Sequence, residues 1–120
     1  LIQLVHYPLM SMVQKEQFAS FHAAHSSRIT WIVGPVMGLE LVSALALFQV
    51  GGVSRLLAII LTSLTAVVFL ATALLSVPAH GDLSGGFDEP AHSRLVSTNW
   101  VRTLAWTLHL VLCIVYPLGK

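Results

Sequence analysis

Two histidines, His22 and His25, lie three residues apart in the segment "FHAAHSSR", directly before a long apolar stretch. Residues with this spacing share one face of a helix, so both imidazoles can point the same way. Imidazole nitrogens ligate zinc and haem iron, and imidazole is also the side chain that titrates nearest to neutral pH. The pair is therefore either a set of ligands or two polar side chains at the entrance of a membrane helix.

The composition indicates an integral membrane protein. The 120 residues are 56% hydrophobic and only 9% charged, whereas soluble domains carry about 25% charged residues. The formal net charge of +1 provides no basic surface, so we expect no nucleic-acid partner. The single cysteine, Cys113, cannot form a disulfide within these residues.

Four apolar stretches predict an all-α integral membrane four-helix bundle that forms one domain over residues 1–120. The first stretch is too short to cross a bilayer of about 30 Å at 1.5 Å per residue. Because it lacks a signal-peptide pattern, we expect it to be the second half of a helix that begins about ten residues earlier. The helices are expected over about 1–12, 29–50, 56–79 and 95–118.

The expected loops differ in length. The second, "GGVS" at 51–54, is short, whereas loop 1 (11–28) and loop 3 (80–99) are longer, polar and on one side. Within loop 3, Asp88 is a candidate N-cap with Pro90 in the next turn, so the last helix can begin near Glu89. The positive-inside rule predicts that loops 1 and 3 face the cytoplasm. Lys15, Arg28, Arg94 and Arg102 lie near this side, and Arg55 and Lys120 near the other.

Five of the six histidines fall at the end formed by loops 1 and 3. Three of them are candidate ligands of a cofactor, with haem and chlorophyll as the candidates, and the pattern does not identify a metal. These three are His6, His22 and His25; the other two at this end are His80 and His92.

Polar residues of the last helix form one stripe. Asn99, Arg102, Trp106 and His109 recur at spacings of 3, 4 and 3, and a polar stripe in a membrane helix faces the bundle interior. Arg102 stays charged and can bind an anionic or phenolate oxygen.

Glu40 and His109 are both expected near the middle of the bilayer. An ionised group at this depth costs roughly 2.5 kcal/mol or more, so we expect Glu40 to face inward. Its partner is then His109 or a hydroxyl of the third helix, or the carboxyl group is protonated. A proton-handling or substrate-binding acid and a structural hydrogen bond that fixes helix register both remain open.

The segments "QLVHYPL", "FHAAHSSR", "GLEL", "VPAHGDLSGGFD" and "NWVRTLAW" resemble a group of small bacterial four-helix membrane proteins of unassigned function. The end of the third helix and the start of the fourth are more distantly similar to anthrone-oxygenase-like membrane proteins. Pro78 with His80, and Asn99 with Arg102, carry this similarity, although that family has asparagine where this chain has His80. The resemblance implies oxygenation of a polycyclic phenolic substrate without a classical cofactor motif.

Two functions follow from these patterns. The first is an accessory subunit of a larger membrane (bioenergetic) complex, which packs against other membrane protein subunits and ligates haem or chlorophyll through histidine. The alternative is a small oxygenase-like membrane enzyme. An enzyme should keep an accessible cavity at the histidine-rich end, whereas a subunit should have that end filled or covered. The candidate catalytic residues are His25, His80, Asn99 and Arg102.

Overall fold

The computed structural model describes residues 1–49 and 52–118, and this part of the chain is all-helical apart from short turns. This confirms the predicted all-α class. A π-helical turn, η1 (Ile2–His6), runs into α1 (Tyr7–Met10), and α2 (Lys15–Ala46) follows after four residues. The next rod is continuous and consists of α3 (Arg55–Ala71), the π-helical turn η2 (Thr72–Ser76) and α4 (Val77–Asp82). The last helix is α5 (Glu89–Leu118).

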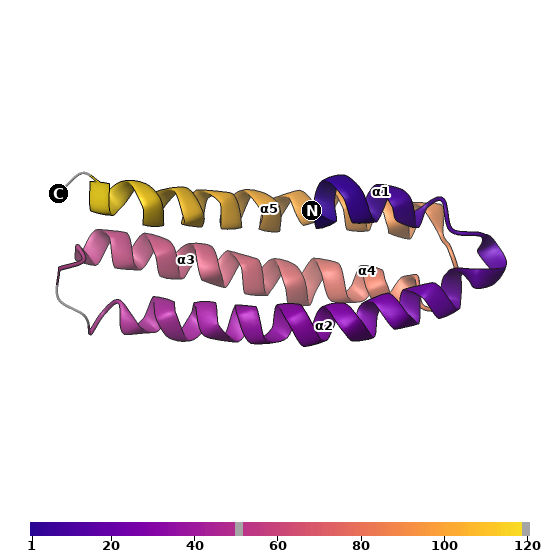
Figure 1. The fold of residues 1–120 in the computed structure, drawn as a ribbon, viewed down its shortest axis with the longest axis horizontal. Helices are drawn as coiled ribbons and strands as arrows, with labels where there is room; N and C mark the ends of the chain where they lie inside the picture. The colour runs from indigo at the N-terminus through magenta and orange to yellow at the C-terminus, as the bar shows by residue number, and fades with distance from the viewer. Residues whose placement is uncertain (50–51, 119–120) are drawn as a thin grey trace.

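The helices form an elongated body with extents of 55 × 21 × 19 Å. The rod that contains α3 lies between α2 and α5, and α3 packs against both (Figure 1). The short η1–α1 segment runs beside α5 at the end of the body where the 11–14 and 83–88 connections lie (Figure 1). We call this end of the molecule the histidine end.

Local sequence explains where the long helices begin. The Ser54 hydroxyl accepts a hydrogen bond from the Leu57 amide at 3.2 Å and caps α3. The Asp88 carboxylate accepts from the Ala91 amide at 2.9 Å, with Pro90 in the first turn of α5. The expected N-cap at Asp88 is therefore confirmed.

The expected helix 29–50 is wrong at its start, because α2 begins at Lys15. Loop 1 is therefore only residues 11–14, and loop 3 only 83–88, so His80 and His92 are helical. The error has a physical reason: hydropathy locates the apolar stretch, whereas the helix continues beyond it as a polar segment that buries Phe18 and His22. The expected positions of Val50, Gly51 and Lys120 lie outside the described residues.

Two helical segments are long and apolar enough to span a membrane, Lys15–Ala46 and Arg55–Asp82. Their outer faces expose large apolar side chains, and so does the outer face of α5. These include Trp31, Leu39, Leu70, Leu74 and Leu104.

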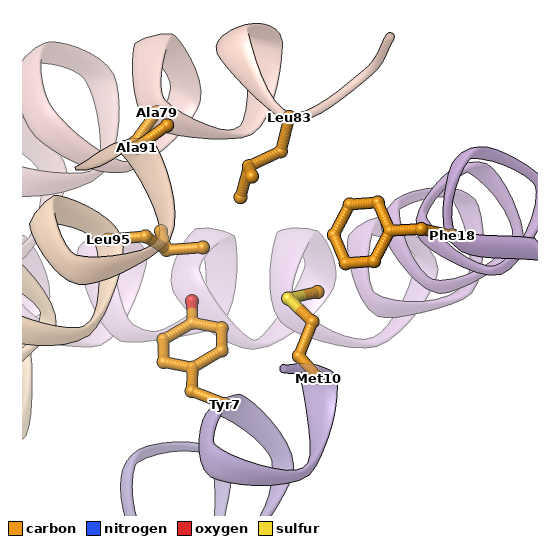
Figure 2. Packing of buried hydrophobic residues seen from close by; sticks show 7 residues of the cluster. All are labelled: Tyr7, Met10, Phe18, Ala79, Leu83, Ala91 and Leu95. Carbon is orange, nitrogen blue, oxygen red and sulfur yellow. The ribbon is translucent and has the colours of Figure 1, made fainter. Parts of the chain in front are cut away.

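The main apolar core lies at the histidine end. Figure 2 shows Tyr7 and Met10 of α1 facing Phe18 of α2 and Leu95 of α5, with Leu83 from the 83–88 connection above them. Phe18 also packs edge-on against the ring of Phe87, with centroids 5.1 Å apart. This core fixes η1–α1 against the longer helices, and a smaller core of Met37, Val68 and Ala105 lies between the three long helices.

We predict that Phe18→Ala destabilises the protein by about 3–5 kcal/mol, because truncation of a fully buried phenylalanine leaves a cavity. Phe48→Ala is the matched control, since that ring is 45% exposed. Thermal unfolding in mild detergent, followed by circular dichroism, measures both. Equal losses in the two variants would contradict a core at this end.

Candidate functional site

Four histidines meet at the histidine end, and we call His6, His22, His25 and His80 the histidine cluster. The rings of His6 and His25 stack with centroids 4.1 Å apart. His22 Nε2 and His80 Nδ1 lie 3.0 Å apart and share a hydrogen bond. The centroids of His25 and His80 are 5.9 Å apart. Three elements, η1, α2 and α4, therefore bring together residues that lie far apart in the sequence.

Because His22 and His25 lie three residues apart on α2, both rings face His80. His25 also stacks on His6. His92 lies apart from the cluster. Its Nε2 donates to the backbone carbonyl of Tyr7 at 2.9 Å, and its ring lies against Phe87. His92 therefore ties α5 to α1 and does not join the other four.

The cluster stacks its rings rather than converging its nitrogens on one point. In residues 1–49 and 52–118, no group of three or more His, Cys, Asp or Glu side chains could hold a metal ion. His22 and His80 use one nitrogen each on one another, and the buried His6 Nε2 has no hydrogen-bond partner among the described residues. This arrangement does not fit a protein-only metal centre, and ligation of haem or chlorophyll by His6, His22 or His25 stays a prediction.

Beside the cluster, Arg102 is held by a chain of side-chain amides and hydroxyls. Its Nε donates to Asn99 Oδ1 at 3.0 Å, and its Nη1 donates to Thr72 Oγ1 at 3.3 Å. Asn99 Nδ2 donates to Gln3 Oε1 at 2.6 Å, and Gln3 Nε2 donates to the Val96 carbonyl at 3.1 Å. This network fixes the guanidinium group and joins α5 to η1 and η2.

The structure adds two residues to this site that the sequence analysis did not single out. Gln3 is buried and completes the Asn99 amide, and the buried Tyr7 lines the same cavity as Arg102. The one signal that could have identified Gln3 is its amide in an otherwise apolar segment, because such a group needs a partner inside the bundle.

These groups surround a cavity of about 580 Å³. All four candidate catalytic residues line it, namely His25, His80, Asn99 and Arg102. The remaining wall is mainly apolar and includes Ile29, Val33, Met37 and the ring of Trp106. The cavity thus has a basic, hydrogen-bonding pole at the histidine end and an apolar body that extends along the helices.

Glu40 forms a second polar group farther along α2. Its Oε1 lies 3.0 Å from His109 Nδ1 and accepts from Thr65 Oγ1 at 3.3 Å, and its Oε2 accepts from Trp106 Nε1 at 2.8 Å. The side chains of Glu40 and His109 are 13% and 16% exposed. Glu40 therefore faces inward and links α2 to α5. It contacts both predicted kinds of partner, His109 and a hydroxyl group of the third helix, which is that of Thr65.

Fold and site together define an all-helical protein with two helical segments long and apolar enough to span a membrane and a histidine–arginine cavity at one end. No family model, curated protein or solved structure matches the chain. The resemblance to anthrone-oxygenase-like proteins stays a prediction, and no residue role is assigned from it.

We predict that Glu40→Leu destabilises the protein by about 1–3 kcal/mol, because it leaves the polar hydrogens of Trp106 and His109 without an acceptor. Glu40→Gln keeps one acceptor oxygen and should lose less. Ser43→Leu, at an exposed position of the same helix, is the control for adding an apolar side chain. Thermal unfolding in detergent compares the three, and a Glu40→Leu variant as stable as the control would show that Glu40 does not tie α2 to α5.

Proposed function

We propose that the chain is an integral membrane protein of the four-helix type that binds an apolar phenolic molecule and takes a proton from its hydroxyl group. One observation carries the proposal: Arg102, His25 and His80 lie at one pole of an otherwise mainly apolar cavity. Its volume of about 580 Å³ falls within the range of about 300–1,000 Å³ that small-molecule sites occupy.

The exposed apolar faces support membrane insertion. Leu39, Leu70 and Leu104 are 70%, 58% and 61% exposed, and continuous apolar faces of this kind are suited to lipid. In this arrangement η1–α1 supplies the fourth helix of the bundle at the histidine end. The charge bias still predicts that the 11–14 and 83–88 connections face the cytoplasm of a bacterial inner membrane.

The chemistry at the polar pole is a proton transfer. The hydroxyl O–H bond of the ligand breaks, its electron pair stays on oxygen, and the proton moves to a ring nitrogen of His25. The phenolate that forms is stabilised by the permanently charged guanidinium of Arg102, which Asn99 and Thr72 hold in place. Oxygenation of that phenolate, which the family resemblance implies, would be a later step with molecular oxygen as co-reactant.

A phenol fits this pole better than a carboxylic acid. A carboxyl group with an ordinary pKa of about 4 is already ionised at neutral pH, so it needs Arg102 but no base. A phenol with a pKa of about 10 needs both a base and a cation that stabilises the resulting anion. The cavity offers both groups at the same pole.

The proposal is tested with 2-hydroxyanthraquinone, a polycyclic phenol whose visible absorption moves to longer wavelength when its hydroxyl group ionises. At a pH at which the free probe is protonated, the purified protein should bind it and produce the phenolate band. Arg102→Gln should weaken binding by about tenfold or more, since it removes the charge. Arg94→Gln is the matched control, because Arg94 pairs with Asp82 away from the cavity.

His25→Phe separates binding from proton transfer. Phenylalanine preserves the ring that stacks on His6 but removes the nitrogen that accepts the proton. The variant should bind the probe without producing the phenolate band, at an unchanged melting temperature. The proposal fails if wild-type protein does not bind the probe, or if the variants and the wild type give the same spectrum.

A cavity at the histidine end is expected of an enzyme rather than of a subunit. The accessory-subunit hypothesis therefore stays a prediction, and it has its own test. Purification from native membranes in mild detergent, with an absorption spectrum of the same peak, decides between them. A large complex with stoichiometric haem or chlorophyll would support the subunit, and a small colourless particle would contradict it.

A further inference from the structure

The mouth of the cavity lies between α2 and α5. Seven residues line the cavity and are also exposed at the surface: Leu1, Leu4, Thr30, Gly34, Val77, Trp100 and Thr107. Three of them, Thr30 and Gly34 on α2 and Thr107 on α5, mark the part of the opening that lies away from η1. α3 packs against both helices, and residues of α2 and of α5 line the cavity that lies between them.

The opening has two defined ends. Toward the histidine end it is bordered by η1, because Ile2 and Gln3 line the cavity. In the opposite direction it is closed by Glu40, which bonds to Trp106 and His109 across the gap. An entrance of limited length therefore lies between these two contacts, level with Gly34.

The surroundings of this entrance are apolar. Trp31 and Val36 on α2 are 80% and 57% exposed, and Leu104 and Leu108 on α5 are 61% and 48% exposed. Trp31 adjoins Thr30 and Leu108 adjoins Thr107 in the sequence, and all four lie in segments that the membrane proposal places in the bilayer. The entrance would therefore open to hydrocarbon rather than to water.

We propose that the ligand enters from the lipid phase through the gap between α2 and α5, with Gly34 as the residue that keeps the gap open. The inference rests on the proposed function and narrows its substrate class to phenols that partition into the membrane. A ligand that enters here passes the Trp106 ring and brings its hydroxyl group to Arg102 and His25, while its apolar body lies against Val33 and Met37.

Gly34 and Gly38 allow a matched test. A Cβ atom built on either glycine meets nothing within 4 Å, so both positions have room for a side chain. Only Gly34 lines the cavity. Gly34→Leu should therefore obstruct the entrance, whereas Gly38→Leu, one turn farther along α2, adds the same side chain away from it.

The experiment uses protein reconstituted in phosphatidylcholine vesicles and 2-hydroxyanthraquinone dissolved in the lipid. Stopped-flow absorption records the rate at which the phenolate band appears. Gly34→Leu should slow this rate by about tenfold or more, and Gly38→Leu should match wild type. Melting temperatures of both variants are measured in parallel.

The outcomes separate the two proposals. If wild type and Gly38→Leu produce the band and Gly34→Leu produces it equally fast, the lateral route is overturned and the proposed function stands. If wild type produces no band, the proposed function fails first. A large loss of stability in Gly34→Leu alone would also overturn the route, because it would show that a packed helix rather than lipid lies against Gly34.

Discussion

The permanent charge of Arg102 is the constraint on which the histidine end depends. A guanidinium group does not lose its proton, so in an apolar bundle other side chains must satisfy its donors. Asn99 and Thr72 accept from it, and Asn99 in turn requires Gln3 for its own amide hydrogens. These hydrogen bonds hold η1 against α5. His6 lies on η1, so the same contact places its ring on His25 and completes the histidine cluster.

Glu40 also needs polar partners inside the apolar bundle, and these partners join α2 to α5. α2 and α5 each pack closely on α3 rather than on one another. Glu40 connects them through its side chain, which bonds to Trp106 and His109 of α5. Trp106 belongs to both polar groups, since its N–H donates to Glu40 and its ring lies 6.0 Å from the Arg102 guanidinium carbon. Two polar links joined by one aromatic ring hold the helices at fixed positions without filling the space between them.

The sequence predicts features that depend on one helix or on depth. The stripe of Asn99, Arg102, Trp106 and His109 follows from helical periodicity, and the pairing of Glu40 with His109 follows from equal depth in the bundle. The start of α2 at Lys15 is not predicted, because the segment before residue 29 is polar overall. Its few apolar side chains, such as Phe18, are buried only by contacts with α1 and the 83–88 connection. The stacking of His6 on His25 likewise cannot be predicted from the spacing of residues, since it depends on where η1 packs against the other helices.

The geometry of the histidines also bears on their chemistry. Between two imidazoles joined as His22 and His80 are, one nitrogen must donate and the other accept, so the pair imposes a tautomer on each ring. If either ring gains a proton, the bond becomes charge-assisted and stronger. Coordination of a metal would require their nitrogens to turn toward a common centre, whereas these rings stack on and bond to one another. The hydrogen bond between His22 and His80 and the stack of His6 on His25 therefore hold the four rings against one another rather than around a shared ion.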